Sequence, residues 1–148
     1  MKSGNSITLP NSSGCAFCDF LEGTKPYTIL SRLDRAATLV TREQRGVAHL
    51  LVVPIRHCET ILDLSDDESL EIMKELRRGA LAIDLAYQRP GIAVWQNNGV
   101  PAHQKVPHVH FHVAGTVDGG GTQWGPVPKL SVAETDAIAG QLRLTSVY

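Results

Sequence analysis

The chain has 148 residues, a length typical of one domain with a buried core. It carries 14 basic and 15 acidic residues, so its charge indicates neither a nucleic-acid partner nor an anionic membrane surface. Three cysteines are too few for a disulfide framework, and this composition favours a cytoplasmic protein. Any recognition of phosphate must therefore come from a local group of residues.

The N-terminal residues are polar and contain no apolar run long enough for a signal peptide or a membrane span. We therefore expect a flexible tail over residues 1–12 and a single domain over residues 13–148. Within that domain we expect the core at about residues 15–115 and a C-terminal extension at residues 116–148.

Five β-prone runs predict strands at residues 27–30, 36–41, 49–53, 92–96 and 109–114. They are irregularly spaced around one expected helix, and repeated βαβ units would alternate regularly. The predicted fold class is therefore α+β, with an antiparallel sheet.

Two capping boxes predict the helix starts. The first, Ser65 to Glu68, precedes a long helix that cannot continue past Pro90. Apolar residues at three- and four-residue intervals predict one buried stripe on it: Ile72, Met73, Leu76, Ala80, Ile83 and Tyr87. The second box, Ser131 to Glu134, predicts a short C-terminal helix that ends at about residue 142.

Three of the six histidines, His108, His110 and His112, alternate with apolar residues. On a strand such residues share one face at a spacing of roughly 7 Å, while the residues between them face the core. The spacing alone leaves open half-exposed strand histidines and a His-x-His metal pair with an open coordination position. The polar loop that starts at Asn97 adds amide donors before the three histidines, whereas sequence alone does not place His49, which opens the third strand.

Several motifs in order resemble the histidine-triad (HIT) family over residues 15–115. Residues 108–114 match its His-φ-His-φ-His-φ-φ signature, in which φ is an apolar residue. Residues 97–99, 104–108 and 49–57 are also similar to the family, and together these motifs displace the metal-hydrolase interpretation of the three histidines. The resemblance implies a HIT-like fold: a five-stranded antiparallel sheet with one long helix and a short C-terminal helix.

The resemblance also implies a mechanism. In the family the middle histidine is the nucleophile, which here is His110, and the nucleotidyl-imidazole that it forms is hydrolysed by water. His112 and His49 would lie beside the non-bridging phosphate oxygens, and Gln104 would donate near the α-phosphate or the attacking water. No catalytic metal is required by this mechanism.

The expected nucleotide-binding residues are Asn97, Thr41, Gln104 and His112. Three positions depart from the family pattern. Thr41 stands where the family has an acidic residue or Asn for the ribose, His103 where glycine is usual, and Lys105 where many relatives have Ser or Thr. Ribose recognition and the preferred leaving group are therefore open.

A second motif, Cys15-x-x-Cys18, has a spacing that suits either one tetrahedral zinc ion or thiol-disulfide exchange. A redox pair normally opens a helix after a strand, whereas this pair follows a polar tail, which favours the metal. The resemblance implies that His57 and His108 complete a structural Cys2His2 zinc site without a part in catalysis. Cys58 is expected to be a small buried apolar residue rather than a ligand.

The resemblance to the histidine-triad family thus implies a homodimeric enzyme that cleaves the α-phosphate bond of purine nucleotide conjugates such as nucleoside phosphoramidates. One alternative is a dinucleoside polyphosphate hydrolase, suggested by residues 39–42 and their distance to His49. Another is a nucleotide-binding dimeric interaction module whose catalysis is incidental.

Overall fold

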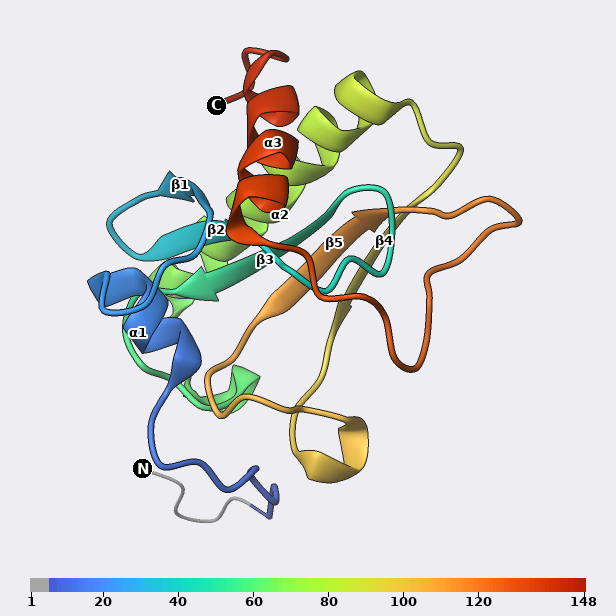
Figure 1. The fold of residues 1–148 in the computed structure, drawn as a ribbon. Coiled ribbons are helices and arrows are strands. Elements are labelled where there is room, and N and C mark those ends of the chain that lie inside the picture. Colours follow the sequence, from blue (N-terminus) through green and yellow to red (C-terminus); the bar gives the residue numbers. More distant parts are fainter. Residues whose placement is uncertain (1–5) are drawn as a thin grey trace.

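A computed structural model describes residues 6–148 and contains a five-stranded antiparallel sheet with a long helix and a C-terminal helix (Figure 1), which confirms the predicted fold class. The helices and strands are, in chain order, α1 (Ala16–Glu22), β1 (Ile29–Arg32), β2 (Ala36–Val40), β3 (His49–Pro54), α2 (Asp66–Tyr87), β4 (Ile92–Gln96), β5 (Phe111–Gly115) and α3 (Val132–Arg143). Two single-turn 3-10 helices, η1 (Ile61–Asp63) and η2 (Val100–Ala102), lie in the connections.

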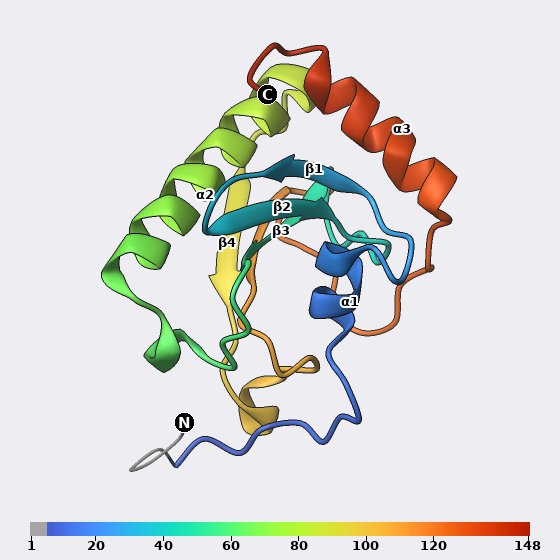
Figure 2. The ribbon, with the colours of Figure 1, turned by 90° about the vertical axis from the view of Figure 1, so that its left-hand side faces the viewer.

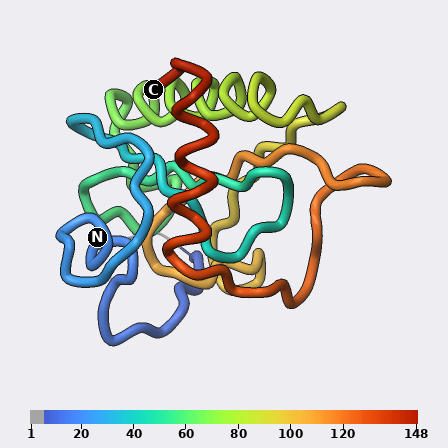
Figure 3. The backbone as a smooth tube through the Cα atoms, turned by 45° about the horizontal axis from the view of Figure 1, so that its top comes forward, coloured from blue at the N-terminus to red at the C-terminus, as the bar shows by residue number. Residues whose placement is uncertain are grey.

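The strand order is β1-β2-β3-β5-β4, so β5 is inserted between β3 and β4, and β4 forms one edge of the sheet. The connection from β3 to β4 contains α2, which packs against β2, β3 and β5. In Figure 2 the ends of α2 and α3 approach each other near the C-terminus, while α1 lies on the other side of the strands. Figure 3 shows α3 running up to α2.

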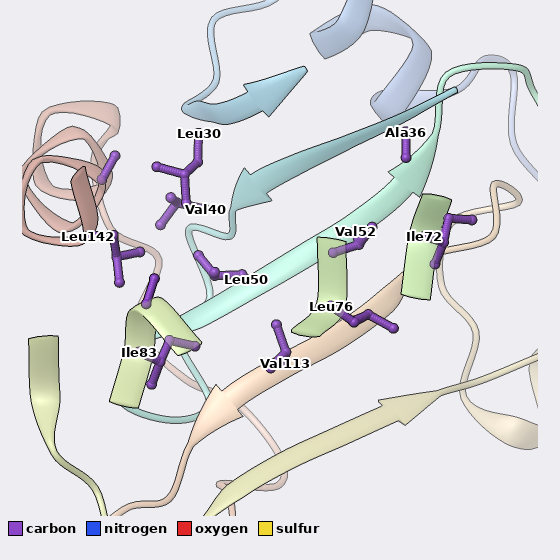
Figure 4. Packing of buried hydrophobic residues seen from close by; sticks show 12 residues of the cluster. Leu30, Ala36, Val40, Leu50, Val52, Ile72, Leu76, Ile83, Val113 and Leu142 are labelled. Atoms are coloured by element: carbon purple, nitrogen blue, oxygen red, sulfur yellow. The ribbon is translucent and has the colours of Figure 1, made fainter. Parts of the chain in front are cut away.

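The alternation of side chains along β3 divides the core between the two faces of the sheet. Leu50 and Val52 point toward α2 and pack in a cluster with Ile72, Ile83 and Leu142 (Figure 4). Leu51 and Val53 point the opposite way and belong to a second cluster that includes Phe17 of α1. Odd-numbered residues of β3, including His49, therefore face α1.

The long helix begins and ends close to the predicted residues, because Ser65 and Glu68 form the expected capping box. Ile72, Leu76 and Ile83 of its predicted stripe are buried, but Met73 is 63% exposed, so its assignment to the core was wrong. Met73 instead belongs to a second, exposed apolar stripe: Leu70, Met73, Leu81 and Leu85. At 100° per residue Met73 is rotated away from Ile72, and only one of the two can face the sheet.

The short helix α1 was not predicted, because seven residues are too few to show a helical period. The Sγ atom of Cys15 accepts a hydrogen bond from the Cys18 backbone N–H, and Gly23 ends the helix with a φ of 82°. The cysteine pair therefore opens a helix, although no strand precedes this helix in residues 6–148.

Two boundaries differ from the expectation. Strand β5 begins at Phe111 instead of Val109, so only His112 of the three histidines lies within a strand. Residues 1–5 of the expected tail lie outside the described residues, and the Thr8 carbonyl accepts a hydrogen bond of 2.7 Å from the Val100 N–H. The extent of a flexible tail stays a prediction. Within residues 6–148, no helix combines the length and apolar character needed to cross a bilayer.

Candidate active site and metal cluster

The three sequence motifs with histidine meet on the α1 face of the sheet. His49 opens β3, and His112 of β5 lies opposite Leu51 of β3, so both imidazoles emerge on the same face. His110 precedes β5, and its ring centroid lies 5.1 Å from that of His112. All three line one cavity of about 640 Å³.

One ring nitrogen of His110 carries a proton and donates a hydrogen bond, and the other is unprotonated. Its Nδ1 lies 2.8 Å from the backbone carbonyl oxygen of His108. A carbonyl only accepts, so Nδ1 carries the proton and Nε2 keeps its lone pair. Burial lowers the pKa of His110, and the hydrogen bond to the His108 carbonyl opposes part of this effect. His110 is therefore a neutral imidazole with a free nitrogen, as nucleophilic attack requires.

His49 and His112 form a directed chain of hydrogen bonds. The Arg45 backbone N–H donates to Nδ1 of His49 at 3.0 Å, so the proton of neutral His49 is on Nε2. That Nε2 lies 3.0 Å from Nδ1 of His112, which must accept. The remaining proton of His112 is then on Nε2, available as a donor within the cavity.

Burial is the main reason why both imidazoles of this chain are neutral. It lowers the pKa of His49 to about 4 and that of His112 to about 2, and the positive charge of Arg45 adds to both shifts. His49 and His112 therefore present hydrogen-bond donors and acceptors, without formal charge, in the free protein near neutral pH.

Aromatic rings line the same cavity and form an apolar wall beside the histidines. Phe17 and Phe20 of α1 line it, and Phe20 is stacked on Tyr27 with ring centroids 3.9 Å apart. The Phe17 ring lies 5.0 Å from the His110 ring, so the wall adjoins the imidazole of His110. The cavity thus combines aromatic rings with imidazole nitrogens, a composition suited to a small ligand with one polar group.

The predicted nucleotide-binding residues are only partly brought together. Thr41 and Asn97 line the cavity, but Gln104 does not. Gln104 is buried, its Nε2 donates to the carbonyls of Glu59 and Val106, and its Oε1 accepts from the Gly99 N–H. Both amide protons are engaged, so direct donation by Gln104 to phosphate is not supported, and its position indicates that it holds the loop before the triad.

Sequence reasoning missed two parts of the cavity. Trp95 of β4 lines the cavity next to His112, its partner in the pairing of β4 with β5. This pairing was the only indication that Trp95 belongs to the site. The loop around Trp124 closes another side, because the Arg45 guanidinium donates to the carbonyls of Gln123 and Gly125. This contact spans about 80 positions and has no local sequence pattern. Figure 1 shows the long excursion of this segment before α3.

Two of the three positions that depart from the family pattern, His103 and Lys105, are exposed and line the same cavity. Besides Lys105, three cationic side chains line it, those of Arg42, Arg45 and Lys129, against the single carboxylate of Glu43. The cavity is therefore positively charged, although the chain as a whole has a formal net charge of −1.

A separate cluster could hold a metal ion. Its four ligand atoms come from Cys15, Cys18, His57 and His108 and all lie within 4.8 Å of one another. Nδ1 of His108 is 3.3 Å from the Cys15 Sγ and 3.6 Å from the Cys18 Sγ, and Nδ1 of His57 is 3.4 Å from the Cys18 Sγ. Sulfur and nitrogen ligands of one tetrahedral zinc ion would be about 3.6 Å apart, so the donor set fits this ion.

The protonation of His108 also suits a ligand. Its Nε2 lies 2.9 Å from the Pro54 carbonyl and must donate, which leaves the lone pair of Nδ1 for the cysteine side. Without a cation, burial followed by the neighbouring Cys15 raises the pKa of the Cys18 thiol to about 12. A bound cation reverses this preference, because a coordinated thiol is deprotonated.

Comparison with known proteins identifies the family. Residues 22–118, about two thirds of the chain, match the HIT domain model, and the chain belongs to this family. An uncharacterized HIT-like protein of Saccharolobus solfataricus is 32% identical over 102 residues, which cover 69% of this chain and 73% of that protein. An adenosine 5'-monophosphoramidase of Schizosaccharomyces pombe is 31% identical over 99 residues, 67% of this chain and 71% of that protein.

Solved structures show the same fold. A zinc-bound histidine triad family protein from Mycobacterium smegmatis superimposes with a TM-score of 0.76 and 21% identity, over 93% of this chain and 100% of that one. At this level of identity the likeness establishes the fold, while the residues of each site rest on the geometry above.

The lowered pKa of His49 predicts a specific loss of stability in acid. The unfolded histidine takes up a proton as the pH falls through about 6.5, whereas folded His49 stays neutral down to about 4. The free energy of unfolding should therefore fall between pH 6.5 and 4, by on the order of 3 kcal/mol from this residue.

Urea unfolding at several pH values, with saturating zinc, checks this expectation. His49→Gln should remove this part of the pH dependence, because glutamine does not titrate. Exposed His103→Gln is the control and should keep the slope of the unchanged protein. Equal slopes for the His49→Gln variant and the unchanged protein would contradict the assignment.

Proposed function

We propose that the chain is a nucleotidyl hydrolase or transferase that cleaves the α-phosphate bond of purine nucleotide conjugates through a covalent intermediate on His110. The observation that carries this proposal is the fixed tautomer of His110, whose Nδ1 donates to the His108 carbonyl. Its free Nε2 belongs to a ring that lines the cavity. Membership of the HIT family and the phosphoramidase relatives support the same activity.

In the proposed reaction, Nε2 of His110 attacks the α-phosphorus, and the bond to the leaving group breaks as the P–N bond forms. The leaving group departs with the electron pair and takes a proton from solvent. Water then attacks the phosphorus and loses a proton to solvent, the electron pair of the P–N bond returns to Nε2 of His110, and a nucleoside monophosphate is released. Each half of the reaction breaks one bond at phosphorus and forms another. Positioning and charge stabilisation therefore account for most of the catalysis.

The neighbouring residues take the remaining roles. His112 offers its Nε2–H to a non-bridging phosphate oxygen, and His49 holds His112 in the tautomer that permits this. The apolar wall of Phe17, Phe20 and Tyr27 suits a purine ring, with Thr41 and Asn97 near the sugar. Gln104 acts indirectly, by fixing the loop that leads to the triad.

The cations of the cavity favour a second candidate function of the same chemistry, hydrolysis of dinucleoside polyphosphates. Lys105 lines the cavity where many relatives have Ser or Thr, and Lys129 lines it as well. Among residues 6–148 neither ammonium group lies within 4 Å of a carboxylate, so both are available to an anion. A leaving group that carries further phosphates would use this charge, whereas a neutral amine would not.

We also propose that the Cys2His2 cluster holds one structural zinc ion. The separations between its sulfur and nitrogen atoms, 3.3–3.6 Å, support tetrahedral coordination. When bound, the ion supplies a cross-link between α1 and the segment before β5, and the reaction itself requires no metal. None of the three cysteines forms a disulfide, as is usual in a reducing compartment, so we propose a cytoplasmic protein.

The exposed apolar stripe supports a homodimer. Met73 and Leu81 of α2 lie more than half exposed, and Val94 on the edge strand β4 is 53% exposed. An uncovered strand edge beside an apolar helix face is the feature that symmetric dimers bury by pairing two equivalent surfaces. We therefore propose that α2 and β4 contact a second copy of the chain.

The nucleophile can be tested by rapid quenching. A nucleotidyl group bound to histidine, labile in acid and stable in base, should form on the unchanged protein and be absent from His110→Ala. Adenosine phosphoramidate, adenylyl sulfate and diadenosine polyphosphates form the substrate panel, and their relative kcat/KM separates the two candidate functions. Activity within about tenfold of normal in His110→Ala would exclude the covalent mechanism.

Metal analysis tests the zinc site. Protein purified without chelator should contain one zinc ion per chain, and the double variant Cys15→Ser, Cys18→Ser should contain about none. The variant should also melt at a lower temperature, because zinc binds the folded chain in preference to the unfolded one. Cys58→Ser is the matched control and should retain the metal. Absence of zinc from freshly purified, unchanged protein would contradict the site.

Light scattering during gel filtration tests the dimer. Met73→Glu and Val94→Lys should each place a charge in the proposed interface and shift the protein toward the monomer. Leu144→Glu changes an exposed apolar residue outside α2 and β4 and should leave the mass unchanged. A monomeric mass for the unchanged protein at micromolar concentration would contradict the proposal.

A further inference from the structure

Trp95 lies directly against the histidine pair, although nothing in the proposed chemistry uses it. It is opposite His112 in the antiparallel pairing of β4 with β5. The ring centroids of Trp95 and His112 are 4.6 Å apart, and their planes are inclined by only 2°. The His49 ring lies 5.1 Å from the same indole, tilted by 40°. Trp95 therefore contacts both members of the hydrogen-bonded pair.

The hydrogen bond from His49 does not by itself fix the orientation of His112. It determines which nitrogen accepts, but an imidazole held at one nitrogen can still rotate about that contact. A parallel ring in contact with one face of the imidazole restricts this rotation. The stacking with Trp95 thus sets the plane in which the Nε2–H of His112 points into the cavity.

A fixed orientation of His112 matters because negative charge develops on the phosphate oxygen only in the transition state. A donor that already points at this oxygen does not have to reorient as the charge develops. Its hydrogen bond is therefore stronger in the transition state than in the ground state, and only such differential contacts raise the rate.

We infer that Trp95 is a positioning residue of the phosphate site, which holds His112 in the orientation that donates to the phosphate. This inference rests on the proposed function, since it assigns His112 to a phosphate oxygen. A residue that merely fills space between β4 and the cavity would affect stability and leave the chemical step unchanged. The two roles therefore separate in kinetic measurements.

The kinetic experiment compares Trp95→Phe with Trp95→Leu. Phenylalanine keeps an aromatic face against His112 and should retain kcat within about threefold. Leucine keeps the apolar character without the face, so kcat should fall about 10- to 100-fold, part of the 10²- to 10³-fold lost with a whole preorganised donor. KM should change by less than about threefold, because the proposed contacts with the purine and the sugar are made by other residues. Zinc content and melting temperature are measured on the same proteins.

A fluorescence experiment detects the contact between Trp95 and His112 without turnover. The chain has two tryptophans, so Trp124→Phe makes Trp95 the only indole. Adenosine 5'-monophosphate is added, with saturation verified by calorimetry for each protein. Its binding should change the emission of Trp95, because the phosphate contacts the imidazole that is stacked on this ring. The same change should be lost when His112→Asn is added to this background.

The outcomes are distinct. A kcat in Trp95→Leu that equals that of the unchanged protein, or a raised KM with unaltered kcat, overturns the inference while the proposed function stands. If the protein turns over no nucleotide conjugate, the proposed function fails. The inference about Trp95 is then decided by whether its emission responds to the bound nucleotide. If Trp95→Leu does not fold, the emission again decides: no response to the saturating nucleotide, or an equal response in the His112→Asn background, overturns the inference.

Discussion

Two hydrogen bonds made by His108 connect the Cys2His2 cluster to His110, the proposed nucleophile. Its ring donates from Nε2 to the Pro54 carbonyl, and its own carbonyl accepts from Nδ1 of His110. The first bond frees Nδ1 of His108 for the cysteine side, and the second frees Nε2 of His110 for the cavity. One fully buried residue therefore fixes the tautomers of two histidines with different tasks. The metal and phosphate sites are separate in chemistry but adjacent in structure.

The alternation of the sheet explains why both sites lie on the same side. Residues of β3 that face α2 build the larger core, so the remaining face is free for polar groups. That face is covered by α1, which Cys15 and Cys18 hold close to His108. The same helix carries Phe17 between the two cysteines, against the His110 ring. A short helix that is too small to be stable alone thus receives its position from the contacts of its cysteines with His57 and His108, and it gives the cavity its apolar wall.

The features that could be predicted from sequence are those with a local pattern. The capping box at Ser65 sets the start of α2, and the alternation of His110 and His112 with apolar residues places them on one face. The cluster of Cys15 and Cys18 with two distant histidines followed from the resemblance to the HIT family, and the structure brings these residues together.

The features that were missed depend on tertiary contacts. The sequence predicted that Gln104 donates to phosphate. In the structure its amide is hydrogen-bonded to backbone groups of Glu59 and Gly99, which only the fold brings near. Met73 was assigned to the core because a helix with two apolar stripes gives one broad periodic signal, and packing alone decides which stripe is buried. Trp95 had no motif, since its importance depends on its strand partner.

The charge of the cavity is distributed in two zones. His49 and His112 are neutral, because burial lowers their pKa values to about 4 and about 2, so the deepest groups act through hydrogen bonds. Formal charge lies among the other lining residues, where the Arg42 and Arg45 side chains are engaged by the carbonyls of Leu130 and Gln123.

The lysines are the cations that remain available to a ligand. In the proposed reaction, Lys105 and Lys129 would attract the anionic substrate, and its α-phosphate would then be transferred to His110, a neutral imidazole that needs no loss of a proton before it attacks. Because the excess charge is carried by flexible side chains and the donors by fixed rings, substrate capture and the chemical step can vary independently. Substitutions of the lysines therefore bear on which leaving group is accepted, and substitutions around His112 on the rate at which it departs.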